Sequence, residues 1–228
     1  SGDDSSYFEI IYGQLYLSNV EHISDKQTYS ITISGISLSG KTVSKDFVIE
    51  VKDFDESSYT SSDDVITGTA EDDYLFGGDG NDTISGGDGN DHLTGGLGND
   101  IINGDAGDDH LFGWGGEDQI KGGSGDDVIY GHGDNDYLFG DDGQDEIHGH
   151  GGVDNIEGGS GNDEIYGGSG DDFLYGDSES GESDLDGDDI INADSGNDSA
   201  WGRGGNDVIY GGFGNDILRG GSGDDIIK

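Results

Sequence analysis

The chain has 228 residues and a formal net charge of −44 at pH 7, because 52 Asp and Glu residues outnumber 8 Lys and Arg residues. This excess of negative charge argues against binding to nucleic acid or to anionic membranes, and it favours metal cations as partners. The hydrophobic content is 29% and the chain contains 48 glycines, so we do not expect it to fold unaided. The absence of cysteine excludes disulfides and thiolate metal sites.

The sequence shows neither a membrane anchor nor a secretion signal. No apolar run approaches the ~20 residues of a transmembrane helix. The first residues, Ser1 to Asp4, are neither basic nor apolar, as a signal peptide would be. The chain does not begin with Met, so we expect it to be part of a longer protein.

Residues 1–56 contain few glycines and several runs in which apolar and polar residues alternate. Residues 29–33 and 47–51 alternate with the period of a half-buried strand, and residues 8–11 and 14–17 flank a turn. We therefore predict about four antiparallel strands with one buried face. Residues 57–67 are polar and rich in serine, and we expect them to form a linker.

Three features of this first segment match a known pattern. Residues 8–15 read Phe-x-Ile-x-x-Gly-x-Leu, a strand follows at 29–33, and residues 53–56 read Asp-Phe-Asp-Glu. In these features the segment resembles the C-terminal half of a cadherin-like β-sandwich. Residues 20–23 and 34–37 depart from that family's acidic motifs, so the resemblance does not imply calcium binding between domains. The alternative is a short β-element that caps the following region.

From Gly68 to Lys228 the sequence repeats every nine residues. Seventeen units follow one another, with one insertion of eight residues at 179–186. Position six is Asp and position eight is aliphatic in all seventeen units. Position one is Gly in sixteen units and position four is Gly in fifteen. Glycines at these places allow a tight loop of about six residues, which leaves positions seven to nine for a strand of about three residues.

The repeat predicts a solenoid. Position eight should point inward because it alone is always aliphatic, whereas the mixed residues at positions seven and nine should face outward. Two units would close one turn of eighteen residues, so each loop would stack on the loop two units away at about 4.8 Å. One aliphatic side chain per strand buries too little surface to offset the entropy of ordering the chain.

The position-six aspartates are the candidate metal ligands. Stacking would bring them together with no Lys or Arg close in sequence, and such like charges are costly unless a cation lies between them. Calcium suits carboxylate and carbonyl oxygens in flexible geometry, whereas magnesium is more demanding and zinc or copper would require His or Cys. The ligands predicted in this way are Asp73, Asp82, Asp91, Asp100, Asp109, Asp118, Asp127, Asp136, Asp145, Asp154, Asp163, Asp172, Asp189, Asp198, Asp207, Asp216 and Asp225.

The repeat is the nonapeptide Gly-Gly-x-Gly-x-Asp-x-U-x, in which U is a large aliphatic residue. Residues 68–228 thus resemble the RTX (hemolysin-type calcium-binding) repeat family. The resemblance implies an all-β fold, a right-handed parallel β-roll that here follows a small antiparallel segment. It also implies calcium held between the loops of units n and n+2, and type I secretion from a Gram-negative bacterium to the exterior or the cell surface.

Stacking of seventeen loops allows at most fifteen calcium sites, some of which we expect to be weaker. One unit carries His132 and Asp134 where glycine is usual, and another has Val153 at position five. The insertion at 179–186 splits the unit that contains Asp189. With Asp184, Asp186 and Asp188 the inserted region offers an extra ion site, but a plain surface loop is the favoured reading.

The sequence can be compared with three classes of function. The first is a calcium-dependent folding module of a secreted protein, with adhesin-type proteins as the expected parents and other domains of that protein as partners. The second is a module that contacts a carbohydrate or a cell surface. Its binding surface would be ladders of position-nine aromatic residues, namely Phe76, Phe112, Tyr130, Tyr166 and Tyr210 on one sheet and Phe139, Tyr175 and Trp201 on the other. Such rings more often pack on one another. An enzyme is not expected, because no nucleophile motif and no HExxH run are present.

Overall fold

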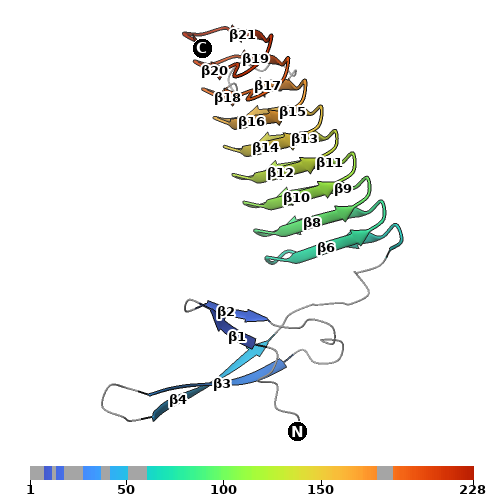
Figure 1. The fold of residues 1–228 in the computed structure, drawn as a ribbon, viewed down its shortest axis with the longest axis vertical. Helices are drawn as coiled ribbons and strands as arrows, with labels where there is room; N and C mark the ends of the chain where they lie inside the picture. The colour runs from blue at the N-terminus through green and yellow to red at the C-terminus, as the bar shows by residue number, and fades with distance from the viewer. Residues whose placement is uncertain (1–7, 12–13, 18–27, 37–41, 51–60, 179–186) are drawn as a thin grey trace. The chain divides into compact units, whose positions relative to one another are not determined.

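The computed structural model describes residues 8–11, 14–17, 28–36, 42–50, 61–178 and 187–228 (Figure 1). These residues form strands and turns and no helix, so none of them belongs to a helix able to span a bilayer. The chain divides into two compact units, residues 1–57 and 58–228.

The first unit contains two antiparallel strand pairs. Strand β1 (Phe8–Ile11) pairs with β2 (Gln14–Leu17), and β3 (Thr28–Ile36) pairs with β4 (Thr42–Glu50). The acidic motifs compared with the cadherin-like pattern at 20–23 and 53–56 lie outside the described residues.

The second unit is a parallel β-solenoid of two nine-stranded sheets (Figure 1). Each strand pairs with the strand two places away, as the stacking of alternate units predicts. The even sheet consists of β6 (Tyr74–Asp79), β8 (His92–Leu97), β10 (His110–Gly115), β12 (Val128–Gly133), β14 (Glu146–Gly151), β16 (Glu164–Ser169), β18 (Ile190–Asn192), β20 (Val208–Tyr210) and β22 (Ile226–Ile227). The odd sheet consists of β5 (Val65–Thr67), β7 (Thr83–Asp88), β9 (Ile101–Ala106), β11 (Gln119–Ser124), β13 (Tyr137–Asp142), β15 (Asn155–Ser160), β17 (Phe173–Asp177), β19 (Ser199–Arg203) and β21 (Ile217–Gly221).

Most strands of the solenoid are longer than the repeat pattern predicts. Strand β7 covers six residues, from position seven of one unit to position three of the next, so the expected length of three was wrong. The glycines that suggested a loop continue the ladder instead, as in the pairing of Gly78 with Gly96. The turn proper therefore contains only positions four to six. The glycine at position four is needed there, because a Cβ on Gly98 would collide with the carbonyl oxygen of Gly80 one turn earlier.

The solenoid also begins earlier than the glycine pattern indicates. Strand β5 lies within the segment 57–67 that we expected to be a linker, and it pairs in register with β7, Val65 opposite Thr83. Ile66 takes the place of a position-eight residue and packs partly against the core.

The core is a double row of position-eight side chains, as predicted. From Ile84 to Ile209 these side chains are fully buried, including the smaller Ala200. At the roll's last strand Ile227 remains 49% exposed. Burying one such side chain contributes about 1.5–3 kcal/mol, and each strand supplies only one.

The insertion leaves the register of the solenoid intact. On either side of residues 179–186, Ile165 pairs with Ile191 and Leu174 with Ala200. The candidate ligands Asp184 and Asp186 lie outside the described residues. At the base of the insertion the buried Asp177 accepts hydrogen bonds from the backbone N–H groups of Gly187 and Gly204, both at 2.8 Å.

Candidate metal centre

The structure brings all seventeen predicted aspartates together in two continuous rows, one along each edge of the roll. Within a row, one carboxylate oxygen (Oδ1) of every aspartate after Asp73 accepts a hydrogen bond from the backbone N–H of the aspartate one turn earlier. These bonds are 2.7–3.1 Å long. Each aspartate is thus held by the loop that stacks on its own loop.

The repeat pattern missed one member of these rows. Asp64 occupies position six of the unit that ends in β5, and its backbone N–H donates to Asp82 Oδ1 at 2.8 Å. The sequence Asp63-Asp64-Val65-Ile66 does match positions five to eight of the repeat. The unit was not recognised because it contains no glycine.

Fourteen of the seventeen aspartates are buried, with at most 2% of their surface exposed. The exceptions are Asp73, Asp216 and Asp225 in the terminal turns, which are half-buried. Burial of so many carboxylates is unusual, since ionised groups are rarely buried without a partner.

The second carboxylate oxygen (Oδ2) of all fourteen buried aspartates has no hydrogen-bond partner among the described residues. In thirteen of the fourteen units this oxygen lies against the position-one glycine of its own unit; the unit of Asp198 begins with Ala193 instead. For example, Asp82 Oδ2 approaches Gly77 so closely that a side chain there would collide with it and with the carbonyl oxygen of Gly95. The preference for glycine at position one follows, because a carboxylate oxygen and a main-chain carbonyl oxygen converge on it.

Burial raises the pKa of these carboxyl groups, and the neighbouring aspartates of the row raise it further. The pKa of Asp100 is raised to about 6, that of Asp127 to about 8 and that of Asp189 to about 9. The hydrogen bond to Oδ1 opposes these shifts without cancelling them. The rows thus favour either protons or a bound cation, which is the alternative way to neutralise buried carboxylates.

The donor set suits a hard cation. The converging atoms are carboxylate and carbonyl oxygens, and none of the fourteen buried carboxylates forms an ion pair with Lys or Arg in the described part of the chain. No group of three or more His, Asp or Glu side chains within these ranges has metal-binding geometry. Carboxylates from two loops would therefore need main-chain carbonyls or water to complete a shell, and calcium accepts such mixed oxygen ligands.

A second ladder runs beside the aspartates, at position five. Asn99 N–H donates to Asn81 Oδ1 at 2.8 Å, and Asn81 N–H donates to Asp63 Oδ1 at 2.9 Å. Here the side chain of the earlier loop accepts, whereas at position six the side chain of the later loop accepts. Successive loops are thus joined in both directions, a role for position five that the sequence did not reveal.

The units expected to be weaker keep their aspartate geometry. His132 and Asp134 adopt positive φ angles of 78° and 74°, as the glycines they replace would. Across the insertion, Asp163 N–H still donates to Asp189 Oδ1 at 2.9 Å. Val153 does interrupt the position-five ladder, because its side chain has no acceptor for the next loop.

Three of the position-nine aromatic residues of the even sheet, Phe112, Tyr130 and Tyr166, stack in one column together with His148. Phe112, Tyr130, His148 and Tyr166 form a column with ring centroids 4.5–5.2 Å apart and nearly parallel planes. Beside it, Trp114, His132 and His150 form a second column at 4.6–5.1 Å. Mutual packing, the alternative expected from the sequence, thus holds for Phe112, Tyr130 and Tyr166.

Five histidines share the outer face of the even sheet, a grouping that the sequence concealed. They come from positions two, seven and nine of different units, and the alternation of units brings them onto one sheet: His92, His110, His132, His148 and His150. Burial lowers the pKa of His92, His132 and His150, which keeps these stacked rings neutral.

The odd sheet has a shorter aromatic stack. Tyr175 and Trp201 lie 4.8 Å apart with nearly parallel planes, and the Arg203 guanidinium covers Tyr175 at 4.7 Å. The ammonium group of Lys121 lies 5.4 Å from the ring of Phe139. These aromatic residues too are engaged within the roll.

Comparison with protein families agrees with this geometry. The model of the RTX calcium-binding nonapeptide repeat (4 copies) matches residues 59–93, 85–120, 115–147, 148–180, 184–218 and 201–228. The first match begins at residue 59, nine residues before Gly68, and so includes the unit of Asp64. No curated protein matches the chain, and the family matches do not reach residues 1–58. Since the matched residues form most of the chain and fold as a parallel roll with aspartate-rich stacked turns, the chain belongs to the family of RTX calcium-binding nonapeptide repeat proteins.

Proposed function

We propose that residues 59–228 form a module that folds when calcium binds between its stacked loops. The observation that carries this proposal is the pair of rows of buried carboxylates, each with one oxygen lacking a protein partner. A bound cation would neutralise these groups, and the thin core alone does not offset their desolvation.

The position-six aspartates predicted from the sequence, together with Asp64, would hold the ions. Two rows of nine aspartates give eight loop pairs each, so the upper limit rises from fifteen ions to sixteen. Calcium supplies positive charge between the carboxylates, while Oδ1 remains bonded to the neighbouring loop. The aspartates of the terminal turns would bind more weakly because they are less buried.

Such a module responds to the change in calcium between the cell and its surroundings. Extracellular calcium modules bind at roughly 10⁻⁴–10⁻³ M, above the calcium level inside cells. The chain would thus stay unfolded before export and fold outside, where ion binding becomes folding free energy. Proteins with these repeats are typically secreted, which supports a secreted or cell-surface location.

The role of the parent protein is the finer part of the proposal. We favour a large adhesin-type surface protein over an enzyme, because the aspartates are committed to the loops and residues 1–56 resemble a cadherin-like segment. This context would make the roll a calcium-stiffened part of a longer protein, in contact with its other domains.

Circular dichroism of the whole chain tests the calcium proposal. At pH 7.5 we expect a coil spectrum in excess chelator and a β-sheet spectrum in millimolar calcium, with no comparable change in millimolar magnesium. A β-sheet spectrum that persists in chelator at this pH would refute calcium-dependent folding. Equal folding by magnesium would refute the choice of ion.

A further inference from the structure

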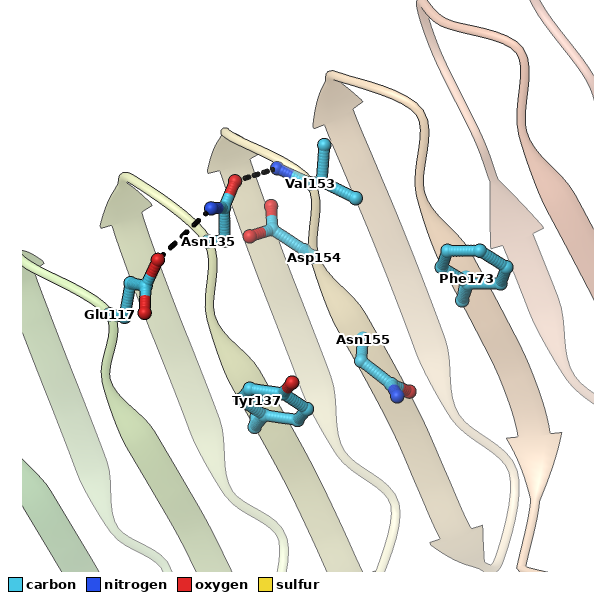
Figure 2. A pocket seen from close by; sticks show the side chains of 7 residues that line it. All are labelled: Glu117, Asn135, Tyr137, Val153, Asp154, Asn155 and Phe173. Atoms are coloured by element: carbon cyan, nitrogen blue, oxygen red, sulfur yellow. Dashed lines mark hydrogen bonds between the residues drawn. The ribbon is translucent and has the colours of Figure 1, made fainter.

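The outer surface of the odd sheet contains a cavity that calcium binding does not explain. It has a volume of about 320 Å³, within the range of small-ligand sites. Figure 2 shows Tyr137 and Phe173 on either side of Asn155, with Glu117, Asn135 and Val153 along the neighbouring loops.

The cavity lies where the smaller Asn155 separates two aromatic residues. Tyr137, Asn155 and Phe173 occupy position seven of the adjacent strands β13, β15 and β17. The two aromatic residues are therefore two strand spacings apart, ~9.6 Å. Tyr137 is 53% exposed and Phe173 is 45% exposed, and neither contacts another ring within residues 61–178 and 187–228.

The gap has the width of one additional ring. A ring placed over Asn155 would lie ~4.8 Å from each aromatic neighbour. This is the 4.8 Å separation of Tyr130 and His148 in the packed column of the even sheet. The two rings of the odd sheet are thus separated by the room that a third ring occupies in a packed column.

Polar groups surround this place. The Asn135 side chain is held in position, because its Oδ1 accepts from Val153 N–H at 2.7 Å and its Nδ2 donates to Glu117 Oε1 at 3.3 Å. The side-chain amide of Asn155 makes no hydrogen bond to the described residues, so it is available to a ligand as both donor and acceptor. Amide and carboxylate groups beside aromatic rings are typical of sites for polyhydroxylated rings, and an apolar ring would leave them unpaired.

The charges of the cavity restrict the ligand further. Its exposed carboxylate, Glu117, is acidic, and the whole chain is strongly negative. The other carboxyl group of the lining, Asp154, is buried and belongs to the candidate calcium row. A uronic acid, a sialic acid or a phosphate would be repelled. A neutral pyranose can pack its C–H groups against Tyr137 and Phe173 and direct its hydroxyls to Asn155 and Glu117.

We propose that Tyr137, Asn155 and Phe173 form a binding site for a neutral pyranose unit of a saccharide. This site differs from the position-nine ladders, because its residues occupy position seven of the odd sheet. It rests on the proposed function, because it requires the folded roll and one residue of its lining, Asp154, belongs to the candidate calcium row.

Isothermal titration calorimetry of the whole chain in saturating calcium tests the site. The probes are cellohexaose and chitohexaose as neutral saccharides, with an alginate hexamer as an anionic comparison. We expect binding of at least one neutral probe and none of alginate. Tyr137→Ala and Phe173→Ala should each weaken binding about three- to tenfold, the effect of losing one aromatic contact.

Two further variants keep the test decisive. Asn155→Phe should abolish binding, because its ring fills the gap at a position where aromatic residues already occur. Phe213→Ala, at a residue that is 82% exposed and outside the cavity, should leave binding unchanged. Circular dichroism must show that each variant still folds with calcium, which separates failure of the site from failure of the module.

The proposal is overturned if the folded chain binds neither neutral saccharide at millimolar concentration, or if Asn155→Phe binds as well as the unchanged chain. It is also overturned if an arginine-containing peptide binds to the folded chain, loses affinity in Tyr137→Ala and Phe173→Ala, and the saccharides do not bind. That result would assign the aromatic pair to cation–π recognition.

Discussion

Acidification in the absence of calcium should promote folding of the roll. The perturbation is a pH series from 8 to 5 in excess chelator. The buried aspartates are ionised in the unfolded chain above pH 3.8 but stay protonated in the fold up to their raised pKa values. Since the folded-state pKa is the higher one, the stability that protons provide is present at low pH and is lost as pH rises through that value.

The structure sets the size of this effect. With a pKa of about 8, Asp127 must take up a proton on folding at pH 7, which costs about 4 kcal/mol relative to a site with an unshifted pKa. At pH 5 this cost falls to about 2 kcal/mol. For Asp100, with a pKa of about 6, the cost changes by only about 1 kcal/mol over the same range. Several aspartates of each row contribute in this way, so the effect accumulates along the roll.

Calcium should reverse the sign of the pH dependence. Its ligands must be deprotonated, so protons compete with the ion and acid should weaken the calcium-bound fold. Circular dichroism measures the folded fraction in both series, and sedimentation checks that the protein does not aggregate as the pH approaches the isoelectric point of about 4.1. Folding that declines towards pH 5 in chelator, or two series with the same sign, would refute the role assigned to the buried carboxylates.

Two further predictions use matched variants. Asp127→Asn keeps the acceptor for the backbone N–H of Asp109 but removes a buried charge. Calorimetry should therefore detect up to two fewer calcium ions, and the calcium-free chain should fold more readily. The exposed Asp126→Asn should change neither property, and equal effects of the two variants would contradict the site. Ile147→Ala leaves a cavity in the core, so it should lower the free energy of unfolding in calcium by about 2–5 kcal/mol, measured by urea denaturation. Glu146→Ala on the outer face is the control. A similar loss of stability in the control would show that burial at position eight does not determine the stability of the roll.

The nonapeptide predicted the architecture of the roll because two of its positions have no alternative environment. An aliphatic residue at position eight is buried only if alternate units form opposite sheets, and an aspartate at position six then falls into a row. The strand length was underestimated because glycine at position one was read as a loop residue. It is a strand residue without a side chain, since the carboxylate of position six lies there.

What the sequence did not reveal depends on neighbours one turn away. Asp64 lacked flanking glycines and was missed. The position-five ladder consists of side-chain to backbone bonds between residues eighteen apart, which a single unit does not show. The cavity arises from the order Tyr137, Asn155, Phe173 across three turns, and no single repeat contains it.

The fluorescence of the two tryptophans can report the order in which the turns of the roll assemble. Trp114 stacks on His132 in the even sheet, and Trp201 stacks on Tyr175 in the odd sheet, across the insertion. Each indole therefore changes its surroundings only when the adjacent turn closes. Fluorescence of single-tryptophan variants would show whether folding proceeds from the amino-terminal turns or starts on both sides of the insertion at the same time.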